Sequence, residues 1–242
     1  MPSSIPHIHL LSMDPTFGTT LQAHLPPSSP ISTTSPPFPT ITIHPCALSS
    51  LPPTTTVTAI VSPANSHGRL DGGFDDAISR FFSPKDDYMA LTRHAQAHLY
   101  RTWRGYLPPG HCDLIPIPGD FAARSKNTFG TKFLALCPTM RVPRDARWDR
   151  EIVYNCVWSL LCAVERHNRV AGDGERIESL LMTPLATGCG GVSEERWARQ
   201  FVLAIRHFEL AGGAGEGDGG WEGLDLVQAS EVAREVEETW AV

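Results

Sequence analysis

The hydrophobic positions of this chain alternate between runs typical of buried strands and the wider spacing of amphipathic helices. Residues 57–61 form a β-branched, almost continuous apolar run, as expected of a strand covered on both faces. Residues 152–164 instead place apolar side chains at helical spacing, with Asp149 as the expected N-cap. The same reasoning predicts strands at 8–11, 41–51, 57–61, 114–117, 132–136 and 177–185, and helices at 74–82, 86–103, 152–164 and 197–208.

This order of elements favours an α/β fold with a mixed, mainly parallel central sheet and helices on both faces, formed by one domain over 1–242. The Pro/Ser/Thr-rich stretch 25–40 and the glycine-rich stretch 211–220 are expected to be surface loops. Apolar residues spaced by four predict a last helix within 226–242. We expect this helix to dock on the core, and a partner-binding helix is the alternative.

Charge and composition narrow the classes of function. The net charge is −6 and Lys and Arg form no cluster, so no face for duplex nucleic acid is evident. No apolar run reaches the roughly 18 residues that cross a membrane, and the first residues do not read as a signal peptide. The 6 cysteines include no C-x-x-C pair, which favours a reducing compartment, cytoplasmic or nuclear. The histidines show no zinc-site spacing, so we expect no metal.

Two glycine-bearing loops carry the candidate chemistry. The first follows the strand at 57–61 and passes Asn65, Gly72 and Gly73 before a helix opens. Ligands of parallel α/β sheets bind at the carboxyl ends of strands, and free amides at a helix start favour anionic oxygens. The second loop, Thr-Gly-Cys-Gly-Gly-Val at 187–192, follows the strand at 177–185 and suits a diphosphate. Either loop alone also fits ordinary turn chemistry, and the pair together points to a ligand.

These residues resemble the signatures of macro domains. Ser-Pro-Ala-Asn at 62–65 and Asp-Gly-Gly-Phe-Asp-Asp-Ala-Ile at 71–78 look like that family's first motif, and 187–192 is similar to its phosphate loop. The strand end at 135–141, Ala-Leu-Cys-Pro-Thr-Met-Arg, also agrees. The resemblance covers about 57–210, and the two ends of the chain match less clearly.

The resemblance implies a three-layer α/β/α fold that holds ADP-ribose, as ligand or product, across the strand ends without a further cofactor. Its partner would be ADP-ribose or an ADP-ribosylated macromolecule. Asn65 would contact the distal ribose, Gly72 and Gly73 would line the ribose and phosphates, and Asp14 would take the acidic position that reads the adenine. The implied ADP-ribose-binding residues are Asp14, Ala64, Asn65, Gly72, Gly73, Phe74, Thr187, Gly188, Cys189, Gly190, Gly191 and Val192.

The resemblance leaves open whether the domain hydrolyses or only reads ADP-ribose. In hydrolytic macro domains an Asp stands ten residues after the Asn and helps to activate water, and Asp75 has that spacing from Asn65. Asp75 equally suits a helix N-terminus. The chain departs from the pattern at Ser62, which replaces an Asn, and at 69–71, Arg-Leu-Asp, which break the glycine run.

Three functions therefore stand as hypotheses. The first is an ADP-ribosyl hydrolase with Asp75 and Asn65 as catalytic residues, and the second is a non-catalytic ADP-ribose reader. The third is an ADP-ribose 1″-phosphate phosphatase, which would need a group such as His67 near the phosphate. His67 also fits a solvent-facing turn, Cys189 fits a small residue that allows close approach, and Arg141 fits either a phosphate or a carboxylate partner.

Overall fold

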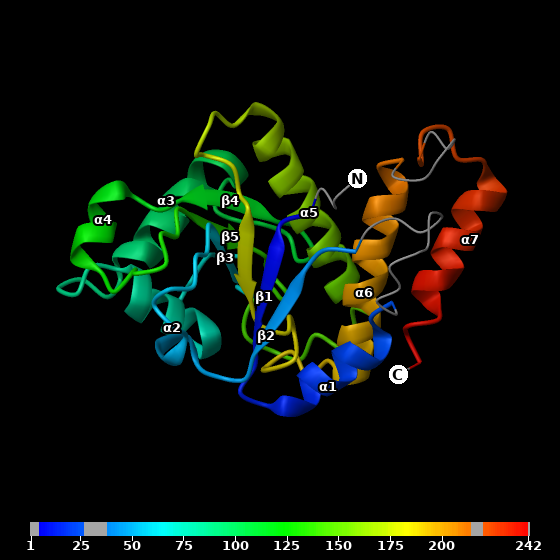
Figure 1. The fold of residues 1–242 in the computed structure, drawn as a ribbon, viewed down its shortest axis with the longest axis horizontal. Coiled ribbons are helices and arrows are strands. Elements are labelled where there is room, and N and C mark those ends of the chain that lie inside the picture. Colours follow the sequence, from blue (N-terminus) through cyan, green and yellow to red (C-terminus); the bar gives the residue numbers. More distant parts are fainter. Residues whose placement is uncertain (1–4, 27–37, 214–219, 242) are drawn as a thin grey trace.

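Within residues 5–26, 38–213 and 220–241, which the computed structural model describes, six strands form one sheet (Figure 1). The sheet order is β2-β1-β6-β3-β5-β4, and each neighbouring pair is parallel except β4 and β5. The mixed, mainly parallel sheet expected from the sequence is thereby confirmed. The strands are β1 (His7–Leu11), β2 (Ile41–His44), β3 (Ala59–Ser62), β4 (Asp113–Pro116), β5 (Phe133–Leu136) and β6 (Ser179–Met182).

Helices cover both faces of the sheet and give three layers (Figure 1). Alternate residues of β3 enter opposite cores, because successive side chains of a strand point to opposite faces. Ala59 and Val61 pack with α1, α5 and α6, whereas Ile60 packs with α2 and α3. The helices are α1 (Pro15–His24), α2 (Gly73–Phe82), α3 (Ala90–Trp103), α4 (Gly119–Arg124), α5 (Ile152–Val170), α6 (Glu194–Ala211) and α7 (Leu226–Glu237), with a 3-10 turn, η1 (Leu48–Ser50).

The last helix docks on the core, as expected. Val236 of α7 is buried, and the Nε2 of Gln200 donates to the Oγ1 of Thr239 at 2.8 Å. The guanidinium of Arg196 donates to the carbonyl of Trp240 at 2.9 Å. These contacts hold the C-terminal segment along α6, so the partner-binding alternative is not needed to explain its apolar spacing.

Several predicted boundaries are wrong for local reasons. Asp149 does not cap α5, because Glu151 holds the N-cap position and Asp149 instead accepts from the amide of Glu151 at 3.3 Å. The strand predicted at 177–185 is shorter, since β6 ends two residues before Pro184. The helix predicted at 86–103 begins at residue 90, after turns that start at Pro84 and Asp87. Residues 48–50 form the turn η1 rather than an extension of β2.

The sequence prediction missed α1 and α4. Helix α1 has an available signal, because Asp14 caps it and Pro15 follows at the first helical position, where the missing N–H is not needed. Most of the loops predicted at 25–40 and 211–220 lies outside the described residues. None of the helices that the structure describes is long and apolar enough to span a membrane.

Three histidines lie together on β1 and β2. The ring centroids of His7 and His9 are 4.1 Å apart, and the Nδ1 of His9 lies 3.0 Å from the Nε2 of His44. Burial of His9, and secondarily the nearby His7 and His44, lower its pKa from 6.5 to about 4. At a pH between about 4 and 6.5, His9 therefore accepts a proton in the unfolded chain and stays neutral in the folded chain.

This histidine cluster predicts acid sensitivity. Because the folded pKa of His9 is depressed, the stability that neutral His9 contributes is unchanged above pH 6.5 and is lost as the pH drops from 6.5 towards about 4. We expect the difference in the free energy of unfolding between the wild type and His9→Gln, measured by urea titration across that range, to shift in favour of His9→Gln as the pH falls. Parallel slopes for the two proteins would contradict the prediction.

Candidate functional site

A cavity of about 750 Å³ lies where the parallel strands end. Residues that follow β2, β1, β6, β3 and β5 all contribute to its wall. The order of the strands in the sheet sets the order in which these segments lie across the cavity. A volume of this size is typical of a small-molecule site. From β2 to β5, the wall residues include Cys46 and Leu48, then Met13 and Phe17, then members of the segment 183–190, then members of 63–75, then Thr139, Met140 and Pro143.

The end of the cavity beside β1 and β2 is apolar. Met13, Phe17, Cys46 and Leu48 provide hydrophobic surface there. Asp14 also lines this end, and its Oδ1 accepts from the amide and hydroxyl of Thr16 at 2.9 and 2.7 Å. The hydrogen bond from the backbone amide of Thr16, and secondarily the one from its hydroxyl, lowers the pKa of Asp14. The residue expected to contact the adenine is therefore a charged N-cap of α1. Only its second oxygen remains for a ligand.

The middle of the cavity is formed by the loop after β6. In the part of the chain that the structure describes, the backbone N–H groups of residues 187–190 donate to no protein acceptor. The loop is closed behind them, where the amide of Gly191 donates to Gly188 and the amide of Val192 donates to Ala186, each at 3.1 Å. Unpaired consecutive amides at a cavity wall are suited to anionic oxygens.

The expected phosphate-loop residues divide into two groups. Residues 187–190 line the cavity, whereas Gly191 and Val192 lie outside its lining and Val192 is buried. Gly190 is required sterically, because a Cβ there would lie 2.4 Å from the carbonyl oxygen of Ala186. Ala186 itself has a positive φ of 62°, which L-residues seldom adopt. The tight turn at Ala186 therefore depends on the absence of a side chain at position 190.

Helix α2 presents a second set of amides. Gly72 is its N-cap, and Gly73 and Phe74 follow on the cavity wall. Within the described residues, the amides of Gly73 and Phe74 donate to no acceptor, as expected at a helix start. Because β3 and β6 are neighbours in the sheet, this helix start and the loop 187–190 flank the same part of the cavity.

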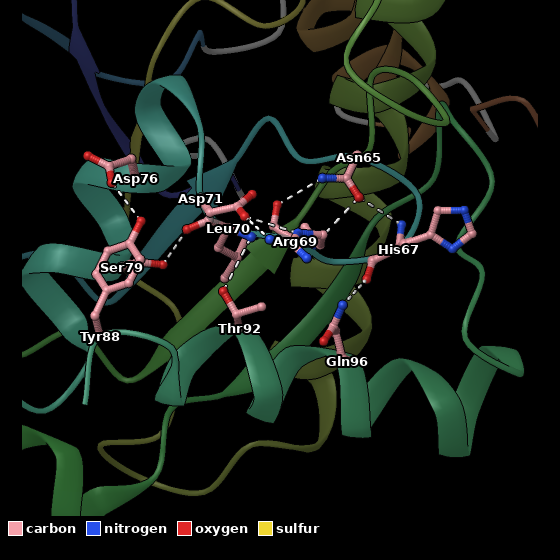
Figure 2. Close-up of polar contacts among 10 residues, drawn as sticks. All are labelled: Asn65, His67, Arg69, Leu70, Asp71, Asp76, Ser79, Tyr88, Thr92 and Gln96. Carbon is pink, nitrogen blue, oxygen red and sulfur yellow. Dashed lines mark hydrogen bonds and ion pairs between the residues drawn. The ribbon is translucent and has the colours of Figure 1, made fainter.

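Asn65 lies on the cavity wall but holds its own loop together (Figure 2). Its Nδ2 donates to the carbonyl of Arg69 at 2.8 Å, and its Oδ1 accepts from the amides of His67 and Arg69 at 3.1 and 3.4 Å. One Nδ2 hydrogen is left over for a ligand, since an amide nitrogen carries two. Contact with a distal ribose stays a prediction, and the role that the structure gives Asn65 is that of a loop clamp. Ala64, beside it, also lines the cavity.

Asp75 is a buried carboxyl at the cavity wall. The Oγ of Ser62 donates to its Oδ1 at 2.6 Å, and the other oxygen accepts no hydrogen bond from the described residues. Burial raises the pKa of Asp75 to about 7, and the negative charge of Asp71 adds to the rise, although the Ser62 bond opposes it. Ser62, fully buried, therefore acts on the cavity only through Asp75.

Acidic side chains outnumber basic ones on the cavity wall. Three acids, Asp14, Asp71 and Asp75, line it, and within the described residues Arg69 is its one cation. The guanidinium of Arg69 is bound to the carboxylate of Asp71, with Nε 3.0 Å from Oδ2. No group of three His, Cys, Asp or Glu that could hold a metal ion is found among residues 5–26, 38–213 and 220–241.

His67 and Arg141 do not line the cavity. The ring of His67 lies 3.3 Å from the carbonyl of Gly105 and contacts Tyr106 edge-on, and the Nε of Arg141 donates to the hydroxyl of Tyr106 at 3.2 Å. Cys189 is an exposed free thiol on the cavity wall. Sequence reasoning missed the wall residues Phe17, Cys46, Leu48, Thr139, Met140 and Pro143. Cys46 and Leu48 fell inside the strand predicted at 41–51, and the only signal for the others is that they follow predicted strands.

The fold is similar to those of solved macrodomain structures from Oceanobacillus iheyensis. One, with ADP, has 20% sequence identity and a TM-score of 0.48, covering 65% of this chain and 72% of that one. A variant with ADPR has 17% identity and a TM-score of 0.49, with 78% and 90% covered. A third, with MES bound, has 18% identity and a TM-score of 0.47, with 77% and 86% covered.

No protein-family model and no curated protein matches the chain. The similarity to the solved structures is one of fold at low sequence identity. What this chain binds must therefore be argued from its own cavity.

The steric role of Gly190 predicts a difference between two glycines of one loop. Gly190→Ala would drive a Cβ into the carbonyl of Ala186, whereas a Cβ at Gly188 meets nothing within 4 Å. We expect Gly190→Ala to destabilise the protein by about 1–3 kcal/mol, as overpacking does. Gly188→Ala should leave the thermal unfolding midpoint nearly unchanged. Equal midpoints for the two variants would show that the loop relaxes around the added methyl group.

Proposed function

We propose that this protein binds ADP-ribose across the carboxyl ends of its parallel strands. The observation that carries the proposal is the unpaired row of amides at 187–190, which lies between an apolar end and a polar end of one cavity. A base suits the surface formed by Met13, Phe17 and Leu48. A diphosphate suits the amides, and a sugar with hydroxyl groups suits the end that holds Asn65 and Asp75.

The dimensions of the sheet support a ligand of this length. The cavity wall spans the ends of strands from β2 to β5, which are separated by four inter-strand intervals. At about 4.8 Å for each interval, the ends of the cavity are roughly 19 Å apart. The apolar end at β2 and Asp75 after β3 are three of these intervals apart, about 14 Å, so a nucleoside diphosphate sugar would bridge them, whereas a nucleoside alone fills only one end.

Hydrolysis of an ADP-ribosyl linkage is the activity that we propose for the polar end. The free oxygen of Asp75 would accept a proton from a water molecule while the water oxygen bonds to the anomeric carbon of the distal ribose. The bond from that carbon to the carrier group then breaks, and the carrier leaves with the electron pair. A pKa near 7 leaves a substantial ionised fraction of Asp75 at neutral pH, and that fraction is the base.

A non-catalytic reader is the second candidate. The commitment of the Asn65 amide to its own loop favours it, because little of that side chain is left to orient a reacting ribose. The position of His67 outside the cavity lining does not support the 1″-phosphate phosphatase. The experiments below separate binding from turnover.

Binding can be tested by calorimetry with ADP-ribose and adenosine. We expect ADP-ribose to bind with a dissociation constant in the micromolar range, about 8 kcal/mol of free energy, and adenosine to bind at least about ten-fold more weakly because it cannot use the amides at 187–190. The absence of binding at roughly millimolar ADP-ribose, about 4 kcal/mol, would overturn the proposed function.

Turnover of an ADP-ribosylated substrate should depend on the protonation of Asp75. Because the base is the ionised form, kcat/KM should rise with pH through about 7, and Asp75→Asn should abolish turnover while preserving ADP-ribose binding. Ser62→Ala removes the bond that lowers the pKa of Asp75, so the rise should move to higher pH. ADP-ribose binding without any turnover by the wild type would instead establish the reader.

A further inference from the structure

Arg69 and Asp71 form an ion pair on the wall of the cavity. In a site for a diphosphate, the guanidinium is expected to contact the phosphate oxygens instead. Both side chains line the cavity, and Arg69 is the one cation among its described lining residues. The guanidinium bond to Asp71 is the main cause that lowers the pKa of this carboxyl. An anion in the cavity and the carboxylate of Asp71 therefore compete for the same guanidinium.

The backbone on both sides of Arg69 is fixed. Asn65 binds the amide and carbonyl of Arg69 itself, and on the far side the amide of Leu70 donates to the Oγ1 of Thr92 at 3.3 Å (Figure 2). The hydroxyl of Ser79 donates to the carbonyl of Leu70 at 2.5 Å, and the Leu70 side chain is fully buried. With the backbone held on both sides, a change of partner by Arg69 would be a movement of its side chain.

The side chain of Arg69 has the freedom for such a rotation. It is 56% exposed, and its partner Asp71 is 35% exposed. An exposed ion pair contributes little to stability, because water solvates both charges and side-chain entropy opposes the contact. An anion held by the amides of 187–190, in contrast, would gain a charge-assisted contact in a partly enclosed site.

We propose that Arg69 is the cationic anchor for the ligand's diphosphate, and that it leaves Asp71 for the phosphate oxygens on binding. Asp71 acts as the competitor that holds Arg69 in the empty site. The ligand class that this arrangement selects is a nucleoside diphosphate, because an uncharged nucleoside offers the guanidinium nothing in exchange for the carboxylate. This inference rests on the proposed function for its ligand, and it assigns roles to two residues that the amide cradle alone does not require.

The arrangement predicts opposite effects of two substitutions. Arg69→Gln removes the anchor and should weaken ADP-ribose binding about ten-fold, the loss expected for one charge-assisted hydrogen bond. Asp71→Asn removes the competitor and one repelling charge, so it should tighten binding about three-fold, with a gain that shrinks as salt is raised. Calorimetry with ADP-ribose, ADP and adenosine measures both effects, and adenosine binding should not respond to either variant.

Two matched variants control for the change in charge. Arg80→Gln and Asp87→Asn each break an exposed ion pair of this region, Arg80 with Asp76 and Asp87 with Arg93, and neither residue lines the cavity. Both should bind ADP-ribose as the wild type does. The thermal unfolding midpoints of all four variants should lie within a few degrees of the wild type, because these ion pairs are exposed.

The outcomes separate this inference from the proposed function. If the wild type binds ADP-ribose but Arg69→Gln behaves like Arg80→Gln, or Asp71→Asn weakens binding as much as Arg69→Gln does, the exchange of partners is overturned and the function stands. If the wild type binds ADP with the expected pattern but not ADP-ribose, the anchor stands and the function falls. Failure to bind either nucleotide overturns both.

Discussion

Parallel hydrogen bonding between five strands places the chemistry of this protein at one edge of the sheet. Each of β2, β1, β6, β3 and β5 runs in the same direction, so the segments that follow them meet on one side. The starts of α1 and α2 lie there as well, with backbone amides that no preceding turn can satisfy. A site rich in backbone amides is the consequence of this topology, and within the described residues Arg69 is the one cation on its wall.

The buried carboxyl at this edge shows how competing electrostatic effects are balanced. Desolvation dominates the pKa of Asp75, because the single hydrogen bond from Ser62 does not replace the water that burial removes. Asp71 adds repulsion, and Arg69 offsets its charge. The four residues 62, 69, 71 and 75 are therefore electrostatically connected, although only three of them face the cavity. Any ligand group that draws Arg69 away from Asp71 also changes the field at Asp75.

The sequence predicted the features that follow from local patterns of apolar residues and glycines. It did not predict the features that depend on hydrogen bonds and burial in the folded chain. The apolar run of β3 predicted a strand covered on both faces, and the glycines at 188 and 190 predicted a loop on the cavity. Asp149 looked like a helix cap, yet the chain turns once more before α5 begins. The Asn65 amide satisfies neighbouring backbone groups, which its residue type alone does not reveal. The raised pKa of Asp75 follows from its burial beside Ser62, a fact of packing.

The order of the strands also fixes how far apart the different parts of the cavity wall lie. Its apolar end follows β1 and β2, its unpaired amides follow β6, and its buried carboxyl follows β3, so each section of a bound ligand would lie against a fixed strand. In the proposed binding mode, a nucleotide that stops at its second phosphate would end beside the amides and would not reach Asp75. Only a molecule that continues past them would present a bond to that carboxyl. Under this proposal the order of the strands sets the length that a ligand needs, and fragments of the ligand would bind without reaching Asp75.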